Sequence, residues 1–525
     1  MASKESSNPE NVSSQKVSRQ KDAVAIRPRN LSDFVDVVLC AVVALGAWVF
    51  LWQASFKVGL QYQLDFGEGL AIATAQQVAK GLTAYPPLNA LPYYFSPYGP
   101  VFYYLMALPL RISGISFTGP RTLLLLALLA CPVLLAFLLR NETGSRKNSF
   151  LFGFLFLSLP VVRLWSGLMR PDALAIALSF GGLCLFLRRR DFLAVVLFVA
   201  ALFVKPTSVA APAAGFVYLL LQLQWRRAAR FAIFGCVLGG ASLLLTQMAT
   251  HGQFLRHTLD LHPGEYKLDQ FFRFVFYAVS MQPVLLLLAM FYVLRDCVRR
   301  RISLFSVYFC TSSLTLLSLG KLGANSNYSL EWAGALCLVS GMGYASLSEL
   351  FPSNPVRFKV GIAAGILVAF ALFSPLLFMP WKYMDLDPQM PELLPWAHHE
   401  IAPGIAPGLN NCATMQAYLR TLPGDKMLSE NAGAALLANK TLLISDMFVY
   451  DQLSLHSPGA LVPVDSMVKN KEVDWILTAA EIPLMRRYQT DRWPASLLDA
   501  IEENYTLRQR FLCTDARALY GRRSP

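Results

Sequence analysis

The sequence predicts a polytopic α-helical membrane protein that carries a small α/β domain in its C-terminal part. Three observations support this fold class. Of the 525 residues, 55% are hydrophobic and only 15% are charged, and the mean hydropathy is +0.44, which lies outside the range of soluble globular proteins. Apolar stretches of about 20 residues, the length of a helix that crosses a bilayer, recur from Phe34 to Met379. The residues that follow have the composition of a soluble domain.

The N-terminal tail is rich in Ser, Asn, Lys and Arg and has no apolar periodicity, so we expect it to be disordered. The first apolar segment, Phe34 to Phe56, is too long for the apolar region of a signal peptide and lacks a convincing cleavage site of small residues. We therefore expect a basic tail over residues 1–32 and a first helix that is retained.

Clusters of Lys and Arg predict the orientation, because such clusters stay on the cytoplasmic side of a membrane. One assignment places every cluster on that side, provided that the short segment 98–112, which Pro100 and Pro109 interrupt, lies in the outer interface. The predicted spans are then 33–55, 120–139, 149–168, 172–187, 191–204, 207–224, 228–250, 271–294, 302–319, 329–348 and 356–379.

These spans, about eleven in number, divide the chain into three parts. A cytoplasmic tail over 1–32 precedes a transmembrane domain over 33–380, whose first outer loop is 56–119 and contains interfacial helices. An extracytoplasmic α/β domain over 381–525 follows, with short apolar strands that alternate with helix-like pieces. Cys412 and Cys513 would be able to pair in it if it faces an oxidising compartment, although the sequence leaves this bond open.

The first outer loop carries two carboxylates, Asp65 and Glu68, in the stretch LDFGEG. Asp-x-x-Glu ahead of LAIATAQQVAK is typical of a helix capping box, with Asp65 as the N-cap and Glu68 at the third position. A partly desolvated carboxylate at this place also suits a general base, which takes a proton from a hydroxyl group. The two roles are compatible, and the residues alone leave open which carboxylate is the base.

Three further charged residues fall on the same predicted face. Asp172 in RPDALAIAL either caps the helix that follows or acts as a second acidic residue opposite the first pair. Lys205 in FVKPTS has the charge to bind a phosphate, on a membrane lipid or on a substrate, and Arg170 would share that role.

Another polar group leads into the segment 329–348. Asn327 and Tyr328 precede Glu331, which either pairs with a lysine or recognises substrate hydroxyl groups. The aromatic stretch YYFSPYGP, with Tyr98, is typical of anchoring in the head-group layer, and its rings would also be able to stack on a sugar. The histidines and acidic residues of 251–270 match no compact metal motif, so this segment predicts a covering loop.

Taken together, these motifs resemble the membrane-embedded glycosyltransferases of the GT-C fold. The chain is similar to the bacterial branch that includes protein mannosyltransferases, lipid A aminoarabinose transferases and rhizobial lipopolysaccharide galacturonosyltransferases. The resemblance covers most of the chain and rests on the order LDFGEG, KGLTAY, YYFSPYGP, RPDALAIAL, FVKPTS and NYSLEW. Many relatives carry adjacent Asp and Glu in the first loop, whereas Phe66 and Gly67 separate the two carboxylates here.

The resemblance implies a polyprenyl-phosphate sugar donor, inversion at the anomeric carbon and a site at the outer membrane face. It implies that a first-loop carboxylate is the base, for which we favour Asp65 over Glu68, and that Asp172 is the second acidic site residue. Lys205 and Arg170 would bind the donor phosphate. The sugar or acceptor pocket would contain Glu331, Asn327, Tyr328 and Tyr98.

The expected function is transfer of a hexosyl or pentosyl unit to a hydroxyl group of a glycan, lipid or protein, in a bacterial inner membrane. A transporter or flippase of a lipid-linked sugar is the alternative from another class. Transporters usually contain two similar halves, and the sequence shows no convincing internal repeat. We expect no nucleic-acid partner, and the motifs require no cofactor, although they are compatible with a divalent metal ion.

Overall fold

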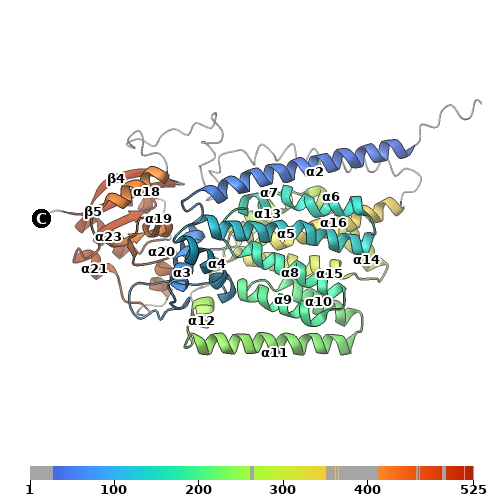
Figure 1. Ribbon diagram of the computed structural model, residues 1–525, viewed down its shortest axis with the longest axis horizontal. Coiled ribbons are helices and arrows are strands. Elements are labelled where there is room, and N and C mark those ends of the chain that lie inside the picture. Colours follow the sequence, from blue (N-terminus) through green and yellow to red (C-terminus); the bar gives the residue numbers. More distant parts are fainter. Residues whose placement is uncertain are drawn as a thin grey trace, which may run out of the picture.

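A computed structural model of the chain describes residues 28–260, 265–350, 361, 365, 412–456, 459, 461–487, 492–513 and 515–523. Within these residues, a bundle of helices lies side by side, and a small sheet with its own helices lies beyond one end of the bundle (Figure 1). This architecture confirms the predicted fold class. The predicted span 356–379 falls outside the described residues, apart from 361 and 365.

The helices of the bundle follow the predicted apolar segments. Each predicted segment from 33–55 to 329–348 coincides with one helix or with two consecutive helices. The elements are α2 (Pro28–Gly59), α5 (Thr118–Thr143), α6 (Arg146–Ser158), α7 (Pro160–Trp165), α8 (Asp172–Leu187), α9 (Asp191–Val204), α10 (Ala210–Leu221), α11 (Trp225–Ala249), α13 (Leu268–Ser280), α14 (Pro283–Val298), α15 (Leu304–Thr315) with the 3₁₀ turn η3 (Leu316–Gly320), and α16 (Leu330–Leu350).

The lengths of these helices vary more than the sequence predicts. Among the described residues, three helices are long and apolar enough to cross a membrane, namely those over 37–59, 118–143 and 225–249. The predicted single span 271–294 is instead the pair α13 and α14, which bends by 90°. Pro283 begins α14, and since proline lacks the backbone N–H that would continue a helix, the break falls directly before it.

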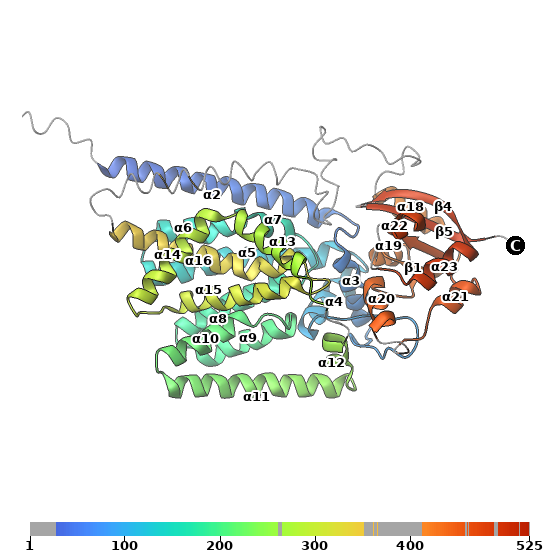
Figure 2. The same ribbon diagram turned by 180° about the vertical axis from the view of Figure 1, so that it is seen from behind.

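Shorter helices from residues 56–119 and from the segment after α11 lie at the end of the bundle that faces the sheet (Figures 1 and 2). They are α3 (Phe66–Ala79), α4 (Pro100–Ser113) and α12 (Gln253–Leu255), which the π-helical turn η2 (Arg256–Asp260) continues. The expectation that the aromatic stretch mainly anchors the head-group layer is wrong for most of its rings. Tyr93 and Phe95 of this stretch belong to the core of the C-terminal domain, and the following Phe102 and Tyr103 are fully buried in the bundle core.

The C-terminal sheet has five strands in the order β2-β1-β3-β5-β4. They are β1 (Lys426–Ser429), β2 (Thr441–Leu442), β3 (Trp475–Thr478), β4 (Tyr505–Cys513) and β5 (Asp515–Arg522). β1 pairs in parallel with β2 and β3, and β5 pairs antiparallel with β3 and β4. The helices α18 (Cys412–Thr421), α19 (Ala432–Leu437), α20 (Met447–His456), α21 (Asp465–Lys469), α22 (Ile482–Arg487) and α23 (Ala495–Asn504) accompany it. A disulfide joins Cys412 and Cys513, the pairing that the sequence left open.

Residues 56–119 and the C-terminal domain form one packed unit. Tyr93 donates its N–H to the Leu443 carbonyl at 2.8 Å and accepts the Ser445 N–H at 2.9 Å, so the loop adds a short parallel bridge beside Ile444. The Gln63 side chain accepts the backbone N–H of Gly433, at the start of α19, at 2.8 Å. These contacts tie the C-terminal domain to both sides of α3, the helix that Asp65 caps.

Candidate active site

Asp65 forms the predicted capping box at the start of α3. Its Oδ2 accepts the backbone N–H of Gly67 at 3.0 Å, and the Glu68 carboxylate accepts the backbone N–H of Asp65 at 3.3 Å. These bonds satisfy N–H groups that would otherwise have no partner at a helix N-terminus. The capping interpretation of the sequence is therefore confirmed.

The Glu68 carboxylate forms bonds that hold neighbouring segments of the chain together. It forms a fully buried ion pair with Arg121 of α5, with distances of 2.8 Å to Nε and 2.6 Å to Nη2, and it accepts the Met169 N–H at 2.7 Å. The remaining Arg121 N–H groups donate to the backbone carbonyls of residues 57, 60 and 62. Burial by itself would raise the pKa of Glu68, but the Arg121 charge and these hydrogen bonds lower it below the usual value. Glu68 thus connects α3 to α5 and lacks a free oxygen.

Asp65 has a different environment, with Arg170 as its charged partner. The Arg170 Nη1 lies 3.1 Å from the Asp65 Oδ2, and 15% of the Arg170 side chain is exposed. Asp65 Oδ1 accepts no hydrogen bond from the described part of the chain. Burial raises the pKa of Asp65, and the Arg170 charge offsets this only in part. A buried carboxylate with a raised pKa and a free oxygen has the properties of a general base.

Arg170 reaches Asp65 because residue 67 is a glycine. A Cβ atom at Gly67 would overlap the Arg170 Nη1, so any larger residue would displace the guanidinium from this position. The same guanidinium lies 5.9 Å from the ring centre of Tyr98 and 5.4 Å from that of Trp165. Its Nε is buried and has no hydrogen-bond partner within the described residues.

The second group of predicted residues surrounds Asp172, the first residue of α8. Its Oδ1 forms an ion pair with Lys205, which directly follows α9, and the Asn327 Nδ2 lies 3.1 Å from both of its carboxylate oxygens. The Lys205 Nζ also lies 4.0 Å from the ring centre of Tyr328. Asp172 therefore neutralises Lys205, and it forms no side-chain bond that caps its own helix.

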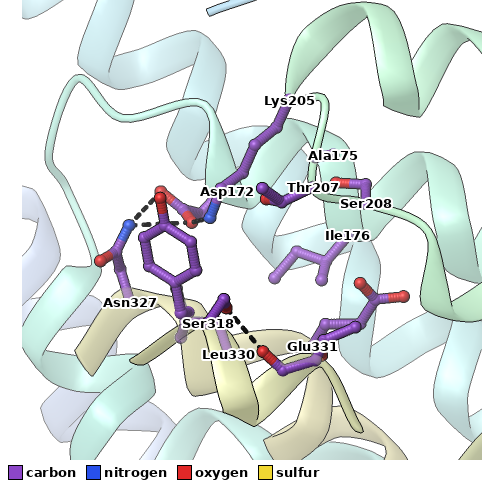
Figure 3. A pocket seen from close by; sticks show the side chains of 12 residues that line it. Asp172, Ala175, Ile176, Lys205, Thr207, Ser208, Ser318, Asn327, Leu330 and Glu331 are labelled. Atoms are coloured by element: carbon purple, nitrogen blue, oxygen red, sulfur yellow. Dashed lines mark hydrogen bonds and ion pairs between the residues drawn. The ribbon is translucent and has the colours of Figure 1, made fainter. Parts of the chain in front are cut away.

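A pocket opens beside this pair. Asp172, Lys205 and Asn327 meet at one side of it, and Glu331 lies across the pocket from them (Figure 3). Tyr308 of α15 donates its hydroxyl to the Glu331 carboxylate at 3.1 Å. The pocket is lined by Asp172, Ala175, Ile176, Lys205, Thr207, Ser208, Thr315, Ser318, Asn327, Tyr328, Leu330 and Glu331.

The two groups adjoin because Arg170 and Asp172 are two residues apart in the chain. Burial is the main cause of the raised pKa of Asp65, and the Asp172 charge adds to it, as expected for two groups that lie close together. The structure thus brings together Asp65, Arg170, Tyr98, Asp172, Lys205, Asn327, Tyr328 and Glu331, whereas Glu68 faces away into the packing around Arg121.

Sequence reasoning missed Arg121, Trp165 and Tyr308, which contact site residues. The sequence hints at a role for Arg121 only in that a charged residue stands at the start of the apolar segment 120–139. The loop after α11 has a packing role, since His257 accepts the Ser96 N–H at 3.1 Å and contacts the Pro86 carbonyl at 2.8 Å. In the part of the chain that the structure describes, no group of three or more His, Cys, Asp or Glu side chains is placed to hold a metal ion.

The chain resembles known proteins in sequence over part of its length and in fold over most of it. Residues 95–320 match the family model of glycosyltransferase family 87. No curated protein sequence matches the chain. Among solved structures, ArnT from Cupriavidus metallidurans bound to undecaprenyl phosphate is 14% identical with a TM-score of 0.54, and the match covers 91% of this chain and 98% of that one. The oligosaccharyltransferase AglB from Archaeoglobus fulgidus, in complex with an inhibitory peptide and a dolichol-phosphate, is 12% identical with a TM-score of 0.50, over 90% and 72% of the two chains.

At these identities the structural matches establish the fold, and the family model shows a similarity to glycosyltransferases over the central part of the chain. The fold that the sequence motifs predicted is confirmed: the chain has the GT-C fold, and its residues 95–320 are similar to glycosyltransferase family 87.

Proposed function

We propose that the protein transfers a sugar from a polyprenyl-phosphate donor to an acceptor hydroxyl group, with Asp65 as the general base. The observation that carries this proposal is the free Oδ1 of the buried Asp65 carboxylate, in the same cluster as two cations and a pocket. The structures of ArnT with undecaprenyl phosphate and of AglB with a dolichol-phosphate support a polyprenyl-phosphate donor.

The base is assigned by comparing the two first-loop carboxylates. Both Glu68 oxygens accept hydrogen bonds from Arg121, and they also accept backbone N–H groups, so a proton from a substrate would displace existing bonds. Asp65 retains one oxygen without such bonds, and its raised pKa increases its affinity for a proton. Asp65 therefore takes the proton of the acceptor hydroxyl, and Glu68 holds the helix that presents it.

The donor phosphate is assigned to Arg170 and Lys205. The Arg170 Nε lacks a partner within the described residues, and a phosphate oxygen would supply one. Lys205 is paired with Asp172, so it would share its charge between the carboxylate and the phosphate. As the bond between the sugar and the phosphate breaks, negative charge grows on the leaving oxygen, and the two cations stabilise it.

Direct attack by the acceptor oxygen on the anomeric carbon is a single displacement, which inverts the configuration at that carbon. The acceptor C–O bond forms while the bond to the phosphate oxygen breaks, and Asp65 receives the acceptor proton. Polyprenyl phosphate leaves as the second product. Asp172, Asn327, Tyr328, Glu331 and Tyr98 would then bind the sugar or the acceptor around this reacting centre.

We further propose that the site faces the outside of a bacterial inner membrane. The disulfide between Cys412 and Cys513 supports an oxidising compartment for the C-terminal domain, which lies at the same end of the bundle as the site. Basic residues gather in the connections at the opposite end, such as Arg188 to Arg190 and Arg299 to Arg301. This distribution supports a cytoplasmic N-terminus.

The experiment that tests the proposal is transfer of labelled sugar by the purified protein from membrane lipid extracts. We expect a labelled product that names the acceptor, with inverted anomeric configuration. If the protein instead moves the labelled lipid across a vesicle membrane without breaking its sugar–phosphate bond, the proposal is wrong and the protein is a transporter.

A further inference from the structure

The first turn of α3, which Asp65 caps, is intrinsically weak because it contains two glycines, Gly67 and Gly69. Glycine loses more backbone freedom on folding than any other residue, which makes it unfavourable inside a helix. Both glycines are nevertheless needed for packing. A Cβ atom at Gly67 would overlap the Arg170 guanidinium, and one at Gly69 would overlap the Gln63 side chain. The orientation of the Asp65 carboxylate therefore depends on contacts from outside the helix.

The C-terminal domain supplies such contacts on both sides of Asp65, since α3 lies between the bundle and the sheet (Figure 2). Before Asp65 in the chain, the Gln63 side chain accepts the Gly433 N–H at 2.8 Å and donates to the Phe66 carbonyl at 3.4 Å. After Asp65, the Arg492 guanidinium lies over the ring of Phe66, with its Cζ 4.9 Å from the ring centre. A guanidinium is attracted to the face of an aromatic ring, so Arg492 holds this ring in place.

Arg492 is itself held by Glu430, which directly follows β1. The Arg492 Nη1 lies 2.9 Å from the Glu430 Oε1, and only 1% of the Glu430 side chain is exposed. The other oxygen, Oε2, accepts the indole N–H of Trp493 at 2.9 Å and the backbone N–H of Ala479, directly after β3, at 3.0 Å. β1 and β3 are parallel neighbours, so the ends of two strands fix the carboxylate and the guanidinium that pairs with it.

We propose that Arg492 is a positioning residue for the base. Through the ring of Phe66 it holds the first turn of α3, and this keeps the Asp65 carboxylate directed at the acceptor hydroxyl. The role rests on the proposed function, because it takes Asp65 as the general base. It gives the C-terminal domain a part in the reaction that requires no contact between Arg492 and the substrates.

The test compares Arg492→Gln with a matched control, Arg510→Gln, in the purified full-length protein in nanodiscs. Arg510 also belongs to the C-terminal domain and pairs with a glutamate, Glu481, and 38% of its side chain is exposed, against 34% for Arg492. Its ion pair joins β4 to the segment after β3 instead of reaching α3. Glu142→Gln, at an exposed position near the far end of α5, is a second control.

Two properties of each variant are measured. The first is sugar transfer from a labelled membrane lipid extract, as kcat and KM, and the second is hydrogen exchange of the backbone amides at Gly67 and Glu68. Arg492→Gln should lower kcat on the order of tenfold with an unchanged KM for the extract, because a small displacement of a general base slows the reaction. Exchange at the two amides should be roughly threefold faster, since the first turn opens more often. Both controls should match the wild type.

Two further variants separate positioning from a general loss of structure. Arg492→Lys keeps the charge beside Glu430 but lacks the planar guanidinium, so its kcat should recover to within roughly threefold of the wild type. Phe66→Leu removes the ring, and Arg492→Gln should then have no further effect on kcat, because both substitutions remove the same contact. Thermal unfolding of each variant confirms that it is folded.

The outcomes distinguish this role from the proposed function. An unchanged kcat in Arg492→Gln overturns the positioning role, and so does a rise in KM alone, which would make Arg492 a binding residue. A lower kcat with unchanged exchange, or additive losses with Phe66→Leu, also overturns it, because Arg492 would then act on the substrates directly. If the wild type transfers no sugar, the proposed function is wrong, and hydrogen exchange alone decides whether Arg492 holds the first turn of α3.

Discussion

Replacing Glu68 with Gln should destabilise the protein much more than replacing Asp65 with Asn. The two carboxylates are three residues apart and belong to the same capping box, yet they have different partners. Glu68→Gln removes the negative charge that neutralises Arg121, and neither side chain of that pair is exposed. Asp65→Asn leaves a side-chain oxygen that can still cap α3, since asparagine is as good an N-cap as aspartate.

The magnitude follows from the bonds that each carboxylate accepts. Glu68 Oε1 accepts from Arg121 Nε and Met169 N, and its Oε2 accepts from Arg121 Nη2, Leu64 N and Asp65 N. Wherever the amide NH₂ of glutamine is placed, it faces at least two donors. Breaking a buried ion pair in this way costs about 3–5 kcal/mol in the free energy of unfolding. For Asp65→Asn we expect about 1–2 kcal/mol, because one bond to a partly exposed guanidinium is weakened.

The assay is unfolding of the purified variants in mixed detergent micelles, followed by tryptophan fluorescence. Arg121→Gln should cost about as much as Glu68→Gln, and the double variant should cost clearly less than the sum of the two, because both substitutions break the same interaction. Equal stability of Glu68→Gln and Asp65→Asn, or additive losses in the double variant, would refute the assignment of Glu68 to structure.

Three further predictions concern the site and the C-terminal domain. Gly67→Ala should lower kcat/KM by roughly 100-fold, because the added methyl group displaces Arg170. The free energy of unfolding should change by less than about 1 kcal/mol. An unchanged kcat/KM would contradict the close packing of Arg170 against this glycine. On acidification, kcat/KM should begin to fall at a pH above about 4, the ordinary pKa of aspartate, because the base must be deprotonated and burial raises the pKa of Asp65. If kcat/KM falls only below about pH 4, the base is instead Glu68, whose pKa is lowered. Cys513→Ser should lower the free energy of unfolding by about 2–4 kcal/mol, since the disulfide closes a long loop. If the unfolding midpoint of the wild type is the same under reducing and oxidising conditions, the disulfide does not form.

Much of the fold follows from local sequence patterns. The apolar segments predict the bundle helices, and the Asp-x-x-Glu pattern predicts the cap of α3, because both depend on neighbouring residues. Pro283 shows the limit of this approach: the apolar run over 271–294 continues through a residue that starts a new helix in another direction.

The partners within the site are less predictable, because they come from distant parts of the chain. Glu68 meets Arg121 across 53 positions, and Asp65 meets Arg170 across 105 positions. Nothing in the sequence near the two carboxylates distinguishes the one that is paired internally from the one with a free oxygen. That difference arises only when α3, α5 and the turn before α8 pack together.

The central claim is that Asp65 acts as the base in transfer from a polyprenyl-phosphate sugar, and its most direct test is the single-turnover rate of Asp65→Asn. The measurement compares wild type, Asp65→Asn and the control Glu142→Gln in nanodiscs, with the donor saturating. We predict that Asp65→Asn binds the donor normally but transfers its sugar slower by roughly 100-fold or more, while Glu142→Gln matches the wild type. A rate for Asp65→Asn within a few fold of the wild type would contradict the account.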